Sequence, residues 1–335
     1  MNHLVVLALA GLVAQLIDGS LGMGYGITST SVLLAGGVTP ATASASVHLA
    51  ELGTNVASGL SHWKLRNVDW RLVLRLGVPG AIGAFLGATV LSHLSAEAAR
   101  PLMATILVGL GLFILARFTV RRTAVSEARV SPHGRRLLAP LGLVGGFVDA
   151  SGGGGWGPIS TTALVSAGRT NPRTVIGSVD TSEFLVSLAA SLGFVVSLGN
   201  SGVRLEFVLA LLAGGLVAAP IAAWLVSRIP PQIMGGLVGG AIVVTNLGQV
   251  FVSFGVPHAA RHPVTVLLLV IWATAVVVGL RRHRADSATA RETAEEPPSP
   301  EPSSASPEPH SSFPEPHSSF PEPHSSFPEL VEGPR

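Results

Sequence analysis

The chain has 335 residues, of which 48% are hydrophobic and only 12% are charged. Charged side chains vanish over long stretches, whereas a soluble domain of this length would show amphipathic stripes with charged faces, so this class of protein is excluded. The absence of cysteine excludes disulfide and thiolate chemistry, and the arginines lie in short loops rather than along one face, so their excess gives no nucleic-acid signal.

Nine apolar segments follow one another along the chain. They lie at roughly 4–36, 41–62, 70–92, 100–118, 138–168, 173–199, 204–227, 232–254 and 263–280. A helix needs roughly 20 apolar residues to cross the hydrocarbon core of a bilayer, and most of these segments approach or exceed that length. The sequence therefore predicts an all-α, multi-pass membrane protein embedded in the lipid bilayer.

The first and fifth segments carry nearly the same motif, about 131 residues apart. Matched pairs are Asp18 and Asp149, Ser20 and Ser151, Tyr25 and Trp156, Pro40 and Pro172, Ser46 and Ser178, and Glu51 and Glu183. A duplicated membrane segment that is broken by glycines is typical of a transporter built from two repeats, whose site lies where the repeats meet.

Two segments, 4–36 and 138–168, are too long for one ordinary span. Glycine runs at 19–26 and 152–157 interrupt them. Glycine loosens a helix and exposes backbone groups that lipid cannot satisfy, so such a break requires surrounding protein or a water-filled cavity. Each long segment is therefore either a broken spanning helix or a re-entrant hairpin of two half-helices.

Basic residues favour the re-entrant alternative. If all nine segments cross the membrane, the better orientation places 12 basic residues inside and 8 outside; if the two broken segments re-enter, the split becomes 17 to 3. The expected fold is then two inverted repeats, each a re-entrant segment plus three spans, with one extra helix. The repeats are 1–119 and 138–254, a basic cytoplasmic loop is 120–137, and the additional helix is 263–281. A count of eight or nine spans stays open.

Residues 285–335 differ in composition from the rest of the chain. They are rich in Pro, Glu and Ser, and a seven-residue repeat spaces His310, His317 and His324 evenly. Such a segment has too little apolar surface to offset the entropy of ordering, so a disordered cytoplasmic tail is expected. The histidines either bind a metal weakly or reflect low-complexity expansion without a site.

Polar residues form a stripe on each helix that follows a break. They recur every three or four residues and so share one face. After Pro40 the stripe is His48, Glu51, Asn55, Ser58 and His62, and after Pro172 it is Asp180, Glu183, Ser187 and Ser191. A buried carboxylate in a bilayer is costly, so the stripe faces either a cavity or a neighbouring helix as packing contacts.

The residues around each break suit an anion. Hydroxyls open the second half-helix, whose N-terminus presents unpaired N–H groups and a partial positive charge, while glycines allow close backbone approach. Candidate substrate-binding residues are Ser20, Gly22, Gly24, Thr28, Ser29, Thr30, Ser151, Gly153, Gly155, Ser160 and Thr161. Alternatively, the glycines serve a close helix crossing.

Buried ionisable residues suggest coupling to protons or another ion. Candidate coupling residues are Asp18, His48, Glu51, Asp149, Asp180 and Glu183. Asp18 and Asp149 either line the site or cap the half-helix that follows. A buried carboxylate and an anionic cargo repel each other, so Glu51 and Glu183 are expected to hold a proton beside the anion and to lose it as the anion leaves, with His48 as a relay.

These residues resemble the sulfite exporter TauE/SafE family of bacterial membrane transporters, over about 1–255. The stretches that carry the resemblance are Asp18–Gly26, Ser44–Glu51, Ser61-His62 with Asn67–Asp69, and Asp149–Pro158. The resemblance implies a permease of the bacterial plasma membrane that moves sulfite, organosulfonates or similar small anions outward, with no cofactor or metal. It does not identify the anion, the coupling ion or the oligomeric state.

Other classes fit less well. An intramembrane aspartyl protease would carry Gly-x-Gly-Asp, but Phe147-Val148 precede Asp149, and no phosphate-binding Gly-x-x-x-x-Gly-Lys-Ser/Thr loop occurs. No enzymatic activity is therefore expected. A passive anion channel stays open as an alternative, because glycine-lined half-helices also build pores, as does an accessory membrane protein.

Overall fold

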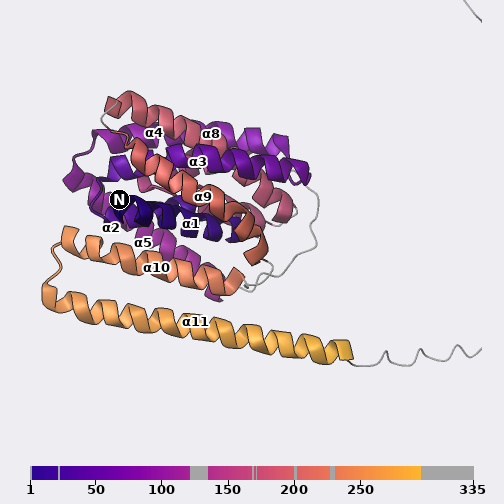
Figure 1. The fold of residues 1–335 in the computed structure, drawn as a ribbon. Coiled ribbons are helices and arrows are strands. Elements are labelled where there is room, and N and C mark those ends of the chain that lie inside the picture. The colour runs from indigo at the N-terminus through magenta and orange to yellow at the C-terminus, as the bar shows by residue number, and fades with distance from the viewer. Residues whose placement is uncertain are drawn as a thin grey trace, which may run out of the picture. The chain divides into compact units, whose positions relative to one another are not determined.

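The structure is a computed structural model that describes residues 2–21, 23–120, 135–167, 170, 172–199, 202–226 and 231–295. Every regular element in these residues is a helix, and the helices up to residue 288 belong to one compact unit (Figure 1). Most of the basic loop predicted at 120–137 and the tail after residue 295 lie outside the described residues.

The first half of the chain contributes five helices. They are α1 (Asn2–Leu21), α2 (Tyr25–Ala35), α3 (Pro40–Lys64), α4 (Trp70–His93) and α5 (Ala96–Val120). Pro40 suits the first position of α3, because proline fixes a helical φ and needs no N–H partner there. The Asp69 carboxylate caps α4 by accepting from the backbone N–H groups of Arg71 and Leu72, at 2.9 and 3.3 Å.

The second half repeats this order of elements. Its helices are α6 (Arg135–Gly152), α7 (Trp156–Ser166), α8 (Pro172–Leu198), α9 (Leu205–Val226) and α10 (Pro231–Ser253). Both short helices, α2 and α7, have 11 residues and follow a glycine with positive φ, Gly24 at 123° and Gly155 at 147°. The duplication seen in the sequence is therefore also a duplication in secondary structure.

Each interrupted segment folds back on itself as a helical hairpin. In the first half, a cavity of about 350 Å³ is lined both by Leu4 and Leu7 near the start of α1 and by Leu33 and Val38 at and after the end of α2. In the second half, a Cβ added to Gly145 of α6 would lie 3.4 Å from the hydroxyl oxygen of Ser160 in α7. The two arms of each hairpin thus lie side by side.

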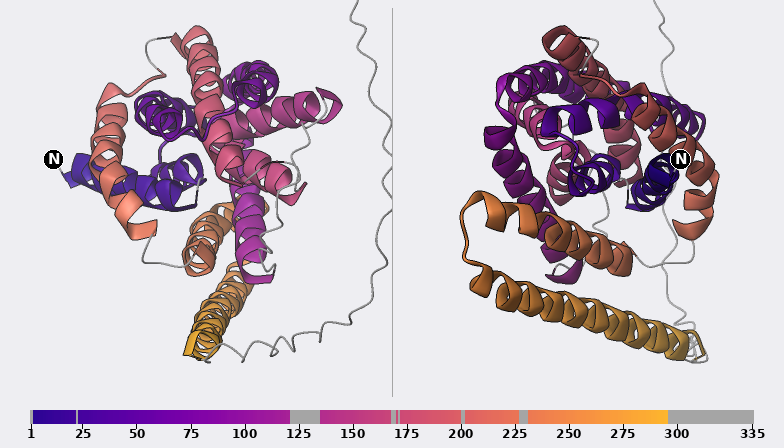
Figure 2. Two further views of the ribbon diagram at one scale, coloured as in Figure 1. Left: turned by 90° about the vertical axis from the view of Figure 1, so that its right-hand side faces the viewer. Right: turned by 60° about the vertical axis from the view of Figure 1, so that its left-hand side comes forward.

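The two halves exchange helices with each other. Helix α4 packs along α6 and α9 packs along α1, while α3 pairs with α8 and α5 with α10 (Figures 1 and 2). The crossings are close: a Cβ on Gly83 would lie 2.0 Å from the carbonyl oxygen of Leu143, and one on Gly214 would lie 1.9 Å from that of Ala8. Small residues at the crossings let the backbones touch, so neither half is packed independently.

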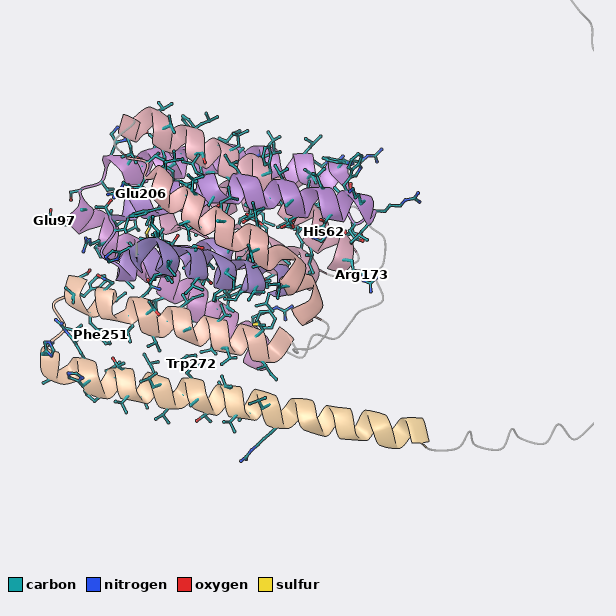
Figure 3. The ribbon with its side chains drawn as sticks, viewed as in Figure 1. His62, Glu97, Arg173, Glu206, Phe251 and Trp272 are labelled. Carbon is teal, nitrogen blue, oxygen red and sulfur yellow. The ribbon has the colours of Figure 1, made fainter. Side chains whose placement is uncertain are left out.

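Helix α11 (His258–Glu295) contacts α10 through Trp272. The Trp272 indole N–H donates to the carbonyl oxygen of Gly236 at 2.9 Å, and Figure 3 shows its side chain between the two helices. The helix runs beyond the predicted end at residue 281 and into the segment predicted to be disordered. Residues 285–295 include four alanines and two glutamates, which favour helix, and Pro297 and Pro298 follow.

Five helices within the described residues are long and apolar enough to cross a membrane. These lie at Trp70–His93, Ala96–Phe118, Arg173–Leu198, Ile233–Ser253 and His258–Arg281. The seven predicted spans also included α3 and α9. Helix α3 carries the polar stripe, which lowers its mean hydropathy, and the apolar stretch described for α9 is Leu205–Ala218.

Candidate functional site

The two glycine breaks contact each other. A Cβ added to Gly26 would lie 2.9 Å from the Cα of Gly154, and one added to Gly154 would lie 2.3 Å from the backbone nitrogen of Ile27. The Thr30 hydroxyl donates to the carbonyl oxygen of Gly153 at 2.5 Å. Segments 123 or more residues apart are thus joined backbone to backbone, which only glycine permits at this spacing.

In the second half, an aspartate at the break caps the short helix that follows: the backbone N–H of Trp156 donates to Asp149 Oδ1 at 2.9 Å. In the first half, the Asp18 carboxylate lies near the backbone N–H of Tyr25, the first residue of α2. Capping was one of the two roles that the sequence offered for these aspartates. The second oxygen of Asp149, Oδ2, makes no hydrogen bond to a described residue and lies 3.8 Å from His48 Nδ1. The Asp149 side chain therefore caps α7 with one oxygen and faces the polar cluster around His48 with the other.

His48 and Glu51 form the centre of that cluster. His48 Nδ1 lies 2.9 Å from Glu51 Oε2, and the Ser187 hydroxyl of α8 donates to the same oxygen at 3.1 Å. The His48 ring stacks on Phe194, with 6.2 Å between the ring centroids. His48 and Glu51 are buried, so the imidazole and the carboxyl can exchange a proton without contact with bulk water.

Asp180 is the centre of a second polar cluster. It occupies the position in the second repeat that His48 occupies in the first. The Ser58 hydroxyl donates to Asp180 Oδ2 at 2.6 Å, and His62 Nε2 lies 3.9 Å from the same oxygen. One turn further along α8, Glu183 lies within electrostatic range of Glu51, Asp18, Asp149 and Asp180. The six predicted coupling residues are thus brought into one polar region.

Several hydroxyls in α2 and α7 are buried without a hydrogen-bond partner among the described residues. They are those of Thr28, Ser29, Ser160, Thr161 and Thr162. They are the fourth and fifth residues of α2 and the fifth to seventh residues of α7, so they lie within two turns of the contacting breaks. An unpaired hydroxyl in a low-dielectric interior is unfavourable, and a bound polar ligand is one way to satisfy it.

Some of the predicted substrate-binding residues do not offer an unpaired hydroxyl to a ligand. The Ser151 hydroxyl donates to the carbonyl oxygen of Phe147 at 2.6 Å, so it is paired within its own helix. Gly24 and Gly155 precede the short helices, and Gly153 accepts the bond from Thr30. Gly22 lies outside the described residues, and the side chain of Ser20 does too.

Two further contacts at the breaks were not predicted. The Asn246 amide of α10 donates to the Ser31 hydroxyl at 2.8 Å, and the Ser44 hydroxyl donates to the carbonyl oxygen of Ala150 at 2.7 Å. Asn246 is a polar residue in an apolar and uncharged helix, and this position in the sequence is a signal that could have found it. Ser44 lies one turn before His48 and so extends the polar stripe of α3, but only the fold reveals its partner. In the part of the chain that the structure describes, no group of three or more potential ligands is arranged to hold a metal ion.

Comparison with known proteins identifies the family. The sequence model named "Sulfite exporter TauE/SafE" matches residues 7–249, which include both breaks and all six coupling candidates. The chain belongs to this family. It is also 49% identical over 283 residues to "Probable membrane transporter protein YtnM" of Bacillus subtilis (strain 168), covering 84% of this chain and 94% of that protein. No solved structure matches the chain.

Family membership and the apolar helices together define the class of protein. The chain is a multi-pass membrane transporter of the TauE/SafE family and not an enzyme. The family membership that the sequence motifs indicated is therefore confirmed.

Proposed function

We propose that this transporter exports a small oxyanion, such as sulfite or an organosulfonate, across the plasma membrane. The proposal rests on one observation: the two glycine breaks meet, near the Ser29 and Ser160 hydroxyls, which have no hydrogen-bond partner among the described residues. Helix N-termini and hydroxyls bind an oxyanion without lysine or arginine. The name of the family points to a sulfur oxyanion as the first candidate.

The proposed architecture is an inverted repeat, with each hairpin re-entering the membrane from its own side. Two features support it. Helices α3 and α8 run antiparallel, since Ser58 meets Asp180 while Glu51 meets Ser187. Figure 3 places Glu97 and Glu206 at one end of the bundle and His62 and Arg173 at the other. With basic loops inside, the latter end faces the cytoplasm, as does the C-terminal tail.

Proton coupling is the proposed source of energy. Glu51 lies against Gly26, where an added Cβ would be 3.0 Å from its Oε1, so an anion at the breaks would sit beside this carboxyl. Two negative charges in a low-dielectric site repel strongly. Anion binding therefore favours the protonated carboxyl, and proton release favours release of the anion, which links the two fluxes.

Reconstitution into liposomes tests the proposal. Flux of sulfite, organosulfonates, sulfate and small carboxylates is followed with and without an imposed pH gradient. We expect a sulfur oxyanion to move fastest and its movement to carry protons at a fixed ratio. Anion flux that carries no protons would instead make the protein a passive channel, and the absence of flux for the whole panel would contradict transport of this class of anion.

A further inference from the structure

The polar clusters around His48 and Asp180 occupy matching positions in the two repeats, but a different residue type borders each cluster. At the spacing of 132 residues that relates Glu51 to Glu183, His48 corresponds to Asp180 and His62 corresponds to Phe194. The structure retains this relation, because His48 stacks on Phe194 while His62 lies beside Asp180. The same place in the fold is thus apolar in one cluster and ionisable in the other.

The two places also differ in exposure. Phe194 is fully buried and covers the His48 ring. The side chain of His62 is 25% exposed, whereas that of Asp180 is 8% exposed. His62 lies in the last turn of α3, next to the exposed residues Lys64 and Arg66 and to the α3–α4 connection. Its ring therefore joins solvent at that end of the bundle to a buried carboxyl.

We propose that His62 is the entry and exit residue of a proton relay between this end of the bundle and Glu51. The relay rests on the proposed function, because it carries the proton that the anion cycle requires. Phe194, at the corresponding place in the other cluster, closes the equivalent route with an apolar ring. The relay is therefore open to water at one end only.

The steps follow the contacts of α3 and α8. Water gives a proton to His62, and the imidazolium passes it from Nε2 to Asp180 Oδ2, which lies 3.9 Å away, a separation that a bridging water spans. Glu183 lies one turn beyond Asp180, and Ser187 lies one further turn along the helix. The Ser187 hydroxyl contacts Glu51 Oε2 at 3.1 Å, which completes the path. Each imidazole or carboxyl group returns to its starting protonation state when it passes the proton on, and the Ser187 hydroxyl takes the proton of Glu183 as it gives its own to Glu51.

The charges around His62 are compatible with this role. On α8, Asp180 faces His62. Near His62 in the sequence, Lys64, Arg66 and Asp69 are exposed to solvent. His62 Nδ1 is buried against Gly177, where an added Cβ would lie 3.0 Å away, and has no hydrogen-bond partner among the described residues. Contact with α8 holds the ring in place, so that Nε2 is the atom that faces the carboxylate.

His62→Gln tests the relay, because glutamine retains polarity and similar size but does not titrate. Proteoliposomes containing a pH-sensitive dye are loaded with sulfite, and two rates are measured: proton movement under a pH gradient and sulfite exchange at equal pH on both sides. We expect proton-linked flux to fall about tenfold or more, since a positioned proton-transfer group contributes about 10²–10⁴-fold. Sulfite exchange should stay within about twofold of the parent rate, a difference of under about 0.5 kcal/mol.

Two more variants separate titration from packing. His62→Ala should regain proton-linked flux when imidazole is added, and His93→Gln, which removes an exposed histidine at the other end of the bundle, should behave as the parent. Full proton flux in His62→Gln overturns the relay but leaves the proposed function standing if Glu51→Gln still uncouples transport. A parent protein that moves no anion of the panel contradicts the proposed function, and the relay with it.

Discussion

Glu51 lies where three parts of the molecule meet: it contacts His48 on its own helix, Ser187 on α8 and the break at Gly26. A carboxyl in this position senses both the state of the imidazole and the occupancy of the breaks. Its duplicate, Glu183, faces the same acidic region from α8. The repeated glutamate therefore places one titratable group of each half within electrostatic range of the other.

Replacing either glutamate by glutamine is expected to abolish the pH dependence of transport. Glutamine keeps the shape and hydrogen bonding of the protonated acid but cannot release a proton. The rate of anion flux between pH 5 and pH 8 should become flat in Glu51→Gln and Glu183→Gln. Glu97→Gln, which changes an exposed glutamate at the end of the bundle, serves as the control. An unaltered pH profile in both site variants would refute the coupling role.

Asp149 offers a way to separate capping from charge. Asparagine retains an acceptor for the Trp156 N–H, so Asp149→Asn should keep its thermal stability, whereas Asp149→Ala should lose about 1 kcal/mol, the usual contribution of an N-cap side chain. Both variants lose the negative charge beside His48. Unfolding midpoints in detergent check this expectation, and equal midpoints for the two variants would argue against a cap at this position.

At the scale of elements, the relative position of the short helices α2 and α7 depends on how closely the two glycine breaks approach each other. The approach requires glycine at Gly26, where a methyl group would meet Gly154 and Glu51 within 3.0 Å. We expect Gly26→Ala to lower anion flux by about tenfold or more and to destabilise the fold by about 1–3 kcal/mol, the usual penalty of overpacking. Flux and unfolding midpoint measure the two effects.

Gly109→Ala is the matched control for this change. Gly109 lies within α5 and an added Cβ there would meet nothing within 4 Å. Alanine favours helix over glycine by about 1 kcal/mol, so this variant should be as stable as the parent or slightly more so. If Gly26→Ala behaved like Gly109→Ala, the breaks would not need to touch.

The helices themselves were largely predictable. Proline at 40 and 172, the glycine runs and the apolar segments predicted where most helices begin and end, because these signals act locally. The end of α11 was missed, since its Ala- and Glu-rich continuation is helical beyond the apolar stretch. Likewise, the polar stripe on α3 predicted a buried polar face, but only three-dimensional packing reveals that Ser58 meets Asp180 and Ser187 meets Glu51.

At the scale of the whole molecule, the exchange of α4 and α9 between the halves explains why the site is shared. Each hairpin is clamped by a helix of the other half, through crossings such as Gly83 on Leu143. Duplication in the sequence predicted two equivalent units, but not that each would pack on the other's hairpin. In the proposed function, motion of one half relative to the other would shift the walls of the site between the breaks, as alternating access requires.

The proposed inverted arrangement predicts the sidedness of the loops. The chain has no cysteine, so a single introduced cysteine is the only thiol that a labelling reagent can modify. Leu65→Cys and Arg173→Cys should react with an impermeant thiol reagent from the cytoplasmic side, and Glu97→Cys and Glu206→Cys from the opposite side. Labelling of right-side-out and inverted vesicles measures this. Reaction of Arg173→Cys and Glu97→Cys from the same side would contradict seven spans with two re-entrant hairpins.

The most direct test of a shared anion site is an experimental structure with selenite, whose selenium gives an anomalous signal and whose shape matches sulfite. We predict one anomalous peak between the starts of α2 and α7, within hydrogen-bond distance of the Ser29 and Ser160 hydroxyls. A peak bound by one half alone, or one at the peripheral cavity beside Arg204 with none between the two breaks, would contradict it.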